Sequence, residues 1–312
     1  MNQSTQTSLE TTSHDASEPR ARTALVLGGG GSTGNAWLIG VIAGLCEAGL
    51  DATAADLLIG TSAGSTAAAQ ITSTTPAHLL ADILAAATAP LAGAGGSARG
   101  PAPIRSVGNQ LETTGAIIAA AVDAADMRRR MGAWALETDA ASPRSAQWRA
   151  TVAARLPHQF WPERRLLITA VNADTGEPVV FDRHSGVDLV DAVAASCASG
   201  FAYRIGDNRY IDGGYRRNEN ADLAGGSARV LALVLSPFGG RSRHPLKWGM
   251  GLATQVDELR AGGSRVETIC PDSDSENLFG TNAMDLSLRP PAARAGYDQG
   301  RDRAAQLTEF WR

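Results

Sequence analysis

The sequence has few cysteines, few aromatic side chains and no long apolar run. Its three cysteines, Cys46, Cys197 and Cys270, lie far apart in 312 residues, so neither a disulfide framework nor a structural zinc site is expected. Aromatic residues make up only 5%, so the core must be built mainly from Ala, Val, Leu and Ile. No stretch reaches the roughly 18 uninterrupted apolar residues of a transmembrane segment. The polar N-terminus lacks the apolar core of a secretion signal, and we therefore expect a cytoplasmic protein.

An excess of charge of one sign is also lacking. Lys and Arg number 28 against 32 Asp and Glu, a formal net charge of -4. This balance provides no general attraction to nucleic acid or to an anionic membrane. No nucleic-acid partner is expected, and any membrane contact must be local.

The order of apolar runs predicts the fold class. Residues 1–21 are polar and are predicted to form a disordered tail, which leaves 22–312 as one domain. Short aliphatic runs predict strands, and apolar residues at helical spacing predict helices between them. This alternation predicts an α/β fold, a three-layer α/β/α domain with a mostly parallel central sheet. The strands are expected at 23–27, 56–59, 166–171, 209–211, 229–236 and 266–270, with a further strand in the segment TGEPVVFD. The helices are expected at 35–50, 65–71, 111–122, 127–136, 145–156, 188–195, 252–261 and 292–310.

A glycine-rich turn, GGGGSTG at 28–34, lies between the first strand and the first helix. Its backbone N–H groups suit an anion or a developing oxyanion near a helix N-terminus. Gly29, Gly31 and Gly34 also satisfy the G-x-G-x-x-G dinucleotide pattern, with Asp51 twenty residues after Gly31. However, Asp51 precedes the second strand instead of following it, at the wrong edge of the sheet for a ribose. A nucleotide-binding oxidoreductase therefore remains only as the alternative interpretation.

Two further motifs carry oxygen side chains at strand ends. Gly60-Thr61-Ser62-Ala63-Gly64 is a G-x-S-x-G between a predicted strand and helix, the context of a nucleophile elbow. The alternative for Ser62 is an ordinary turn of small residues. Asp212 follows a short strand and precedes two glycines, which by itself is typical of an Asx turn.

A serine nucleophile needs a base, and the histidines after Ser62 offer no persuasive one. They lie at helix starts, after prolines or in turns, and only two of them remain as weak candidates for a triad, His184 and His244. The full set comprises His78, His158, His184 and His244.

In this order, the three motifs resemble those of the patatin-like phospholipase family, over residues 23 to about 235. The resemblance implies that Ser62 is the nucleophile and that Asp212 activates it directly in a dyad without histidine. It also implies an oxyanion hole formed by backbone N–H groups of about Gly29, Gly30 and Gly31, with no cofactor or metal. Lipid esters such as phospholipids would be the substrates.

The chain departs from the family pattern in its loop and near its aspartate. Thr33 stands where the loop usually carries a basic residue, Gly28 stands where an Asp is frequent, and Gly200 replaces a common Pro. Because the glycine turn carries no charged side chain, the positive charge that the family's loop usually supplies is missing here. A non-catalytic relative is therefore a further alternative. Backbone donors do not depend on these side chains.

Two loops are candidates for contact with lipid. The segment 236–248 places Phe238 and Trp248 around Arg241, Arg243 and Lys247, which suits peripheral membrane contact. A solvated basic loop with packed aromatics is the competing interpretation. Residues 90–103, rich in Gly, Pro and Ala, are expected to form a loop that is either a mobile cover or a surface insert.

Overall fold

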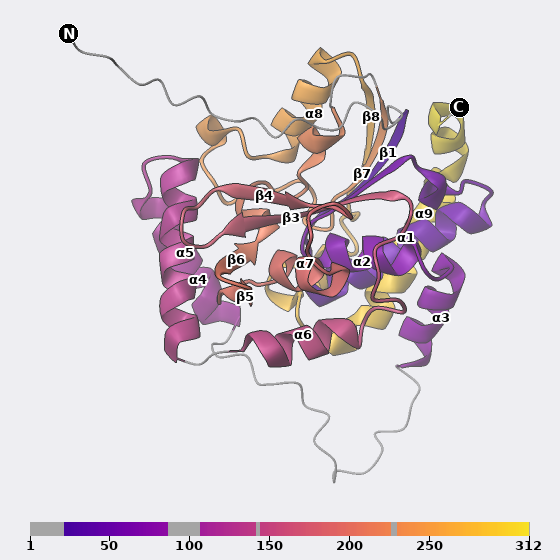
Figure 1. Cartoon of the computed structure of the whole chain (residues 1–312). Helices are drawn as coiled ribbons and strands as arrows, with labels where there is room; N and C mark the ends of the chain where they lie inside the picture. Colours follow the sequence, from indigo (N-terminus) through magenta and orange to yellow (C-terminus); the bar gives the residue numbers. More distant parts are fainter. Residues whose placement is uncertain (1–21, 87–106, 142–143, 226–229, 312) are drawn as a thin grey trace.

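The computed structural model describes residues 22–86, 107–141, 144–225 and 230–311 (Figure 1). The predicted loop at 90–103 and the predicted tail at 1–21 lie outside these ranges. The strands are β1 (Thr23–Leu27), β2 (Leu57–Gly60), β3 (Arg165–Asn172), β4 (Pro178–Phe181), β5 (Tyr203–Ile205), β6 (Asn208–Asp212), β7 (Leu231–Leu235) and β8 (Arg265–Ile269). The α-helices are α1 (Gly31–Glu47), α2 (Ala63–Ile71), α3 (Pro76–Ala85), α4 (Val107–Ala120), α5 (Ala124–Ala141), α6 (Ser145–Ala153), α7 (Leu189–Ser196), α8 (Leu252–Ala261) and α9 (Arg289–Trp311).

One mostly parallel sheet organises the chain, which confirms the predicted fold class. Its strand order is β5-β6-β3-β2-β1-β7-β8, and β4 pairs with β3. The strands β1, β2, β3, β7 and β8 run parallel. The strands β4 and β6 run antiparallel to β3, and β5 runs antiparallel to β6. The strands at TGEPVVFD and 209–211 were predicted, but strand β5 and the antiparallel pairing were not.

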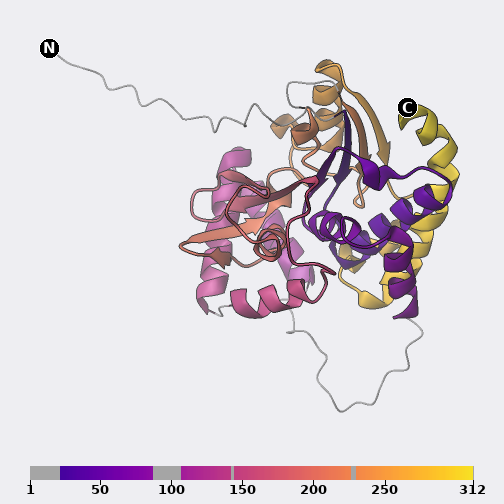
Figure 2. The same ribbon diagram turned by 45° about the vertical axis from the view of Figure 1, so that its right-hand side comes forward.

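Helices cover both faces of the sheet (Figures 1 and 2). Successive strand residues point to opposite faces. Leu25 and Leu58 therefore pack in the cluster that includes α1, α2, α3, α7 and α9. Their neighbours Val26 and Ile59 pack with α8 on the other face. The pair α4 and α5 packs near Val171 of β3 and β6 in a third cluster.

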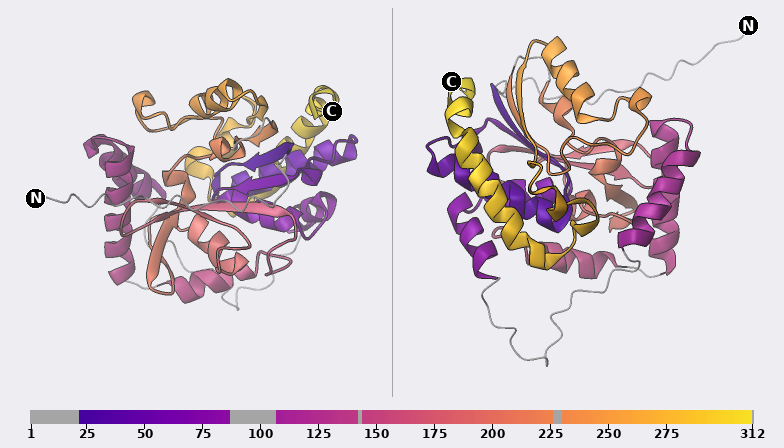
Figure 3. Two further views of the ribbon diagram at one scale, coloured as in Figure 1. Left: turned by 45° about the horizontal axis from the view of Figure 1, so that its top comes forward. Right: turned by 180° about the vertical axis from the view of Figure 1, so that it is seen from behind.

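The C-terminal helix α9 lies alongside α1 (Figure 3, right). Each helix brings two glycines, four residues apart and hence on one face, to the contact. A Cβ on Gly44 would lie 2.1 Å from the carbonyl oxygen of Tyr297, and Cβ atoms on Gly40, Gly296 and Gly300 would lie between 2.1 and 2.3 Å from a backbone oxygen. The two backbones are therefore in direct contact, and only glycine fits at these four positions.

The parallel register brings three turns to one edge of the sheet. Leu27, the last residue of β1, pairs with Gly60 of β2 and with Leu235 of β7. The glycine turn, the turn containing Ser62 and the start of the 236–248 loop therefore leave the sheet side by side. Among the described helices, none has both the length and the apolar character needed to cross a bilayer.

Candidate active site

The glycine turn after β1 lies directly beside the turn after β2. A Cβ built on Gly29 would lie 3.5 Å from the Cβ of Ser62. A Cβ on Gly64 would lie 1.9 Å from the carbonyl oxygen of Leu27, so α2 begins in backbone contact with β1. Gly64 is therefore required by this close approach, whereas a side chain at Gly29 would meet Asn218, whose Oδ1 would lie 2.7 Å from its Cβ.

Ser62 occupies a strained turn between β2 and α2. Its φ of 52° and ψ of -117° lie in a region that residues with a Cβ rarely adopt. Such a turn is characteristic of a nucleophile elbow, because it lifts the hydroxyl above the end of the strand. The side chain is half-buried, and Ala63 immediately begins helix α2. The positive end of that helix therefore lies next to the hydroxyl.

The end of α7 holds the strained turn in place. The Ser62 N–H donates to Ser196 Oγ at 2.9 Å, and the Cys197 thiol donates to the Ser62 carbonyl oxygen at 3.1 Å. Ser196 is fully buried. The carbonyl oxygen of Ala198, the residue after Cys197, accepts the N–H of Asp212 at 2.9 Å. Three consecutive residues thus bind the backbones of both Ser62 and Asp212, a link that no motif in the sequence indicated.

Asp212 ends strand β6 and points toward Ser62. Its carboxylate accepts the Gly214 N–H at 2.8 Å, and it lies near enough to Ser62 for that side chain to lower its pKa. The turn needs glycine next, because a Cβ on Gly213 would lie 2.3 Å from Thr169 Oγ1. The antiparallel pairing of β6 with β3 places Asp212 opposite Ala170. This pairing brings the carboxylate to the serine across 150 residues of chain.

The surroundings of Asp212 raise its affinity for a proton. The residue is 8% exposed. Burial raises the pKa of its carboxyl from 3.8 to about 6, against the lowering effect of hydrogen bonds from Gly214 and Ser62. A higher pKa makes the ionised carboxylate a better base. Near neutral pH the group is still mostly ionised, so it can accept a proton.

The backbone donors of the glycine turn are not equivalent. The Gly29 N–H donates to the carbonyl oxygen of Asn218 at 3.0 Å, so it is engaged within the protein and is not free to bind an oxyanion. The N–H groups of Gly30 and Gly31 have no partner within the described part of the chain. Of the three expected donors, these two are available. Ala63, which follows the serine, also has an N–H without a partner there.

Two distant segments pack against the turn and fix its shape. A Cβ on Gly30 would lie 2.5 Å from Pro237 Cβ, and one on Gly31 would lie 2.8 Å from the carbonyl oxygen of Ala283. Gly31 also has a φ of +64°, which glycine adopts without strain. That Ala283 carbonyl accepts the N–H of Thr33 at 3.0 Å. The loop is therefore held from both sides, and side-chain charge is not needed for its conformation.

A buried polar network connects the three motifs, and sequence reasoning missed it. Asn220 is fully buried, with a left-handed φ of 54° that asparagine tolerates better than most residues. Its Nδ2 lies at 3.0 Å from Thr61 Oγ1, at 3.2 Å from Thr169 Oγ1 and at 3.2 Å from the Gly213 carbonyl oxygen. It therefore ties the strand end before Ser62 to the turn after Asp212.

The neighbouring Glu219 serves the glycine turn. It is 1% exposed and accepts hydrogen bonds from Ser236 at 2.7 Å, Asn218 at 2.9 Å and Gln255 at 3.2 Å. Asn218 in turn donates to the Gly29 carbonyl oxygen at 3.3 Å. The only sequence signal for this network is a run of polar residues, RRNEN, directly after the Asp212 turn.

The candidate histidines lie in other surroundings. His78 Nε2 lies 3.6 Å from the Asp82 carboxylate on the exposed side of α3, and His158 is exposed. His184 lies in an exposed turn after β4, where its N–H binds the Asp182 carboxylate. His244 Nδ1 lies 2.9 Å from Ser242 Oγ, and burial together with the charge of Arg243 lowers its pKa to about 4.

Asp51 does not face the glycine turn. It precedes β2, whereas the turn follows β1, so the two lie at opposite edges of the parallel sheet. Its carboxylate accepts the N–H of Thr53 at 3.0 Å and the hydroxyl of the same residue at 2.6 Å. Asp51 therefore acts as a local cap for the turn at Thr53. It is not placed to bind a ribose, as the dinucleotide interpretation requires.

The 236–248 loop is closer to a solvated basic loop with packed aromatic side chains than to a loop that inserts into a membrane. Phe238 and Trp248 are half-buried, and Leu246 is the exposed apolar residue, at 91%. Arg241 pairs with Glu276 at 2.6 Å. The Arg243 guanidinium donates to α4, at 2.9 Å to Thr114 and at 2.6 Å to the Leu111 carbonyl. Two of its cations are thus engaged within the protein.

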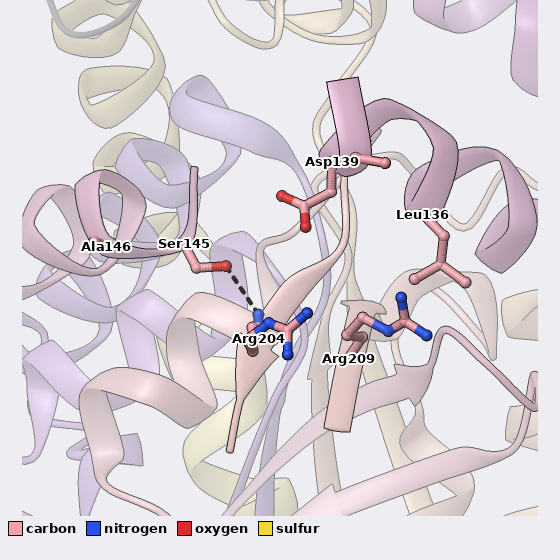
Figure 4. Close-up of a pocket in the computed structure, with 7 residues that line it drawn as sticks. Leu136, Asp139, Ser145, Ala146, Arg204 and Arg209 are labelled. Atoms are coloured by element: carbon pink, nitrogen blue, oxygen red, sulfur yellow. Dashed lines mark hydrogen bonds between the residues drawn. The ribbon is translucent and has the colours of Figure 1, made fainter. Parts of the chain in front are cut away.

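A separate hollow of about 450 Å³ lies between α5, the start of α6 and strands β5 and β6 (Figure 4). Arg204 and Arg209 project into it from the strands, and Asp139 faces them from α5. Ser145 is engaged as an acceptor of the Arg204 N–H at 2.9 Å, and Arg209 pairs with Asp174. Neither Ser62 nor Asp212 lines this hollow.

The family model for patatin-like phospholipase matches residues 25–224. This range is more than half of the chain, and the chain therefore belongs to the patatin-like phospholipase family. Membership supports a hydrolase that acts on lipid esters. The matched range includes Ser62, Asp212 and the glycine turn, whereas α8 and α9 lie beyond it.

Among solved structures, the chain is similar to VipD from Legionella pneumophila, with 15% identity and a TM-score of 0.43 over 91% of this chain and 67% of that one. It is also similar to the type III effector protein ExoU, with 16% identity and a TM-score of 0.37 over 91% of this chain and 53% of that one. The chain thus spans about half of the length of ExoU. No curated protein matches its sequence.

Proposed function

We propose that the protein is a serine acyl hydrolase that cleaves carboxylic esters of lipids through a Ser62–Asp212 dyad. One observation carries the proposal: a serine on a strained turn lies beside a buried carboxylate, Asp212, whose pKa burial raises and the Ser62 side chain lowers. A carboxylate in contact with an alcohol, shielded from water, can act as its general base.

In the proposed reaction, Asp212 takes the hydroxyl proton as Ser62 Oγ attacks the ester carbonyl. The N–H groups of Gly30 and Gly31 stabilise the oxyanion of the tetrahedral intermediate. Collapse of this intermediate releases the alcohol, which takes the proton from Asp212, and leaves an acyl-Ser62. Asp212 then deprotonates a water molecule that attacks the acyl group, so the fatty acid leaves and Ser62 regains its proton. The scheme uses no cofactor or metal.

Covalent labelling tests the nucleophile. A fluorophosphonate probe should modify Ser62 in the folded protein, and the Ser62→Ala variant should remain unlabelled. Ser185→Ala, in the exposed turn after β4, is the matched control and should label like the wild type. No adduct on folded wild-type protein would instead favour a non-catalytic member of the family.

Ester hydrolysis tests the base. Asp212→Asn should abolish hydrolysis of short-chain esters while the variant stays folded. Substitution of His184 or His244 by alanine should leave the rate within about twofold, the range typical of surface substitutions away from the site. Loss of activity in either histidine variant would replace the dyad by a triad.

A further inference from the structure

Two arginines project side by side into the hollow between α5, the start of α6 and the hairpin of β5 and β6 (Figure 4). Arg204 of β5 is the register partner of Arg209 of β6, so both side chains lie on one face of the hairpin. Like charges in such a cross-strand pair repel each other unless counter-charges compensate them. Arg209 is compensated, because its Nε lies 3.2 Å from the Asp174 carboxylate. Arg204 forms no ion pair among the residues that the structure describes, so its charge is uncompensated.

Asp139 faces the arginines from α5 with an unsatisfied oxygen. Its Oδ1 is buried and has no hydrogen-bond partner within the described part of the chain. A buried carboxylate oxygen without a donor is costly. Asp139 and Arg204 both line the hollow, yet they form no ion pair with each other. The two opposite charges therefore face each other across open space (Figure 4).

The start of helix α6 adds donors on the side of Arg204. Ser145 and Ala146 line the hollow and begin this nine-residue helix. Their backbone N–H groups have no partner inside the helix, the residue before them supplies no side-chain cap, and no other described backbone group accepts them. Ser145 Oγ accepts the Arg204 N–H at 2.9 Å, so its own proton is available to a ligand. Together with the positive end of the helix, these groups favour an anion beside Arg204.

The hollow has the size and the lining of a small-molecule site. Its volume of about 450 Å³ lies within the usual range of about 300–1,000 Å³ for such sites. The rest of its wall is apolar and consists of Leu136, Ala140 and Ala146. Because the pair of Arg209 and Asp174 is neutral, the fixed charges that remain are one positive, on Arg204, and one negative, on Asp139. The site therefore has no net charge.

We propose that this hollow binds a small zwitterion, a molecule with a carboxylate at one end of a short aliphatic chain and an ammonium group at the other. The ligand carboxylate accepts hydrogen bonds from the Arg204 guanidinium and from the N–H groups at the start of α6, and the ligand ammonium donates to Asp139 Oδ1. A zwitterion matches a site without net charge, whereas a simple anion leaves Asp139 unsatisfied. Neither Ser62 nor Asp212 lines the hollow, and the proposal does not depend on ester hydrolysis.

A series of amino acids of increasing length is the probe: glycine, β-alanine, 4-aminobutyrate and 5-aminopentanoate. Butyrate and butylamine serve as ligands with a single charge. Binding to the full chain is measured by saturation-transfer NMR and by calorimetry. At least one amino acid should bind with a Kd of about 1 mM or lower. It should bind about tenfold or more tightly than butyrate and butylamine, because each of these lacks one charge-assisted contact.

Substitutions separate the two ends of the site. Asp139→Asn should weaken binding of that amino acid by about tenfold or more without weakening butyrate, which carries no ammonium. Arg204→Gln should weaken the amino acid and butyrate alike, and Arg204→Lys should restore part of both. Glu137→Gln, at an exposed position of α5, is the control and should keep the wild-type affinities. Melting temperatures of all variants report whether they are folded.

Three outcomes would overturn the assignment. If no amino acid of the series binds the wild type at about 10 mM, which would fill about nine-tenths of a site with a Kd of about 1 mM, the hollow is not a site for this class of ligand. If butyrate binds as tightly as the amino acids and Asp139→Asn changes neither affinity, the hollow takes a simple anion. If binding is the same in the wild type, Asp139→Asn and Arg204→Gln, the ligand binds elsewhere on the protein.

Discussion

Replacement of Asp212 by asparagine tests whether the carboxylate is truly held away from water. Asparagine has nearly the same shape and can still accept the Gly214 N–H, but it carries no ionisable proton. The pKa of Asp212 rises from 3.8 to about 6 on folding, chiefly through burial. This rise corresponds to about 3 kcal/mol, since each pKa unit is worth about 1.4 kcal/mol.

The direction in which pH changes the stability follows from proton binding to Asp212. Because the folded state binds this proton more tightly than the unfolded state, the contribution of Asp212 to stability is complete below about pH 4 and is lost as the pH rises through about 6. The asparagine variant has no such loss. Its free energy of unfolding, relative to the wild type, should therefore grow by about 2 kcal/mol between pH 4.5 and 7.5, most of the full value of about 3 kcal/mol, while ester hydrolysis disappears.

Urea unfolding at several pH values measures this difference. Asp207→Asn, at an exposed position in the turn between β5 and β6, is the control for a change of net charge. If the difference between Asp212→Asn and the wild type is the same at pH 4.5 and pH 7.5, the carboxylate is not desolvated and the argument for its basicity fails.

Three further outcomes are expected. The value of kcat/KM for ester hydrolysis should fall about tenfold per pH unit below about 6, because protonated Asp212 cannot act as a base; a flat profile down to pH 5 would contradict this role. Gly30→Ala should lower kcat by about 10²- to 10³-fold, because its Cβ would lie 2.5 Å from Pro237 Cβ and would displace the N–H that is expected to bind the oxyanion. Gly251→Ala, whose Cβ would meet nothing within 4 Å, should be neutral in the same assay. Gly44→Leu should lower the unfolding free energy by at least about 3 kcal/mol, because its Cβ would lie 2.1 Å from the Tyr297 carbonyl oxygen; a melting temperature equal to that of the wild type would show that α1 and α9 are not in close contact.

The sequence predicted the parallel part of the fold because its signals are local. The strand at Thr23–Leu27 and the helix at Leu252–Ala261 have the predicted bounds, since apolar periodicity and glycine turns mark them. Helix α1 begins at Gly31, four residues earlier than its pattern indicated. Gly, Ser and Thr are weak helix formers, and contacts from Pro237 and Ala283 hold this first turn in helical form.

The antiparallel part could not be predicted in the same way. Strand β5 has only three residues, and β6 pairs with β3 across a long stretch of chain. Pairing of this kind depends on burial in the assembled sheet and leaves little trace in a short segment. The sequence contains Asp212, but its position beside Ser62 results from this pairing.

By itself, the sequence determined the α/β class, the motifs around Ser62 and Asp212, and the glycine turn, because each depends on residue types a few positions apart. Only the tertiary structure decided which turn amides remain unpaired, since the partner of Gly29 is Asn218, far along the chain. It also decided the raised pKa of Asp212 and the meeting of Arg204 with Asp139 at one hollow, because burial and charge proximity arise only when distant segments pack together.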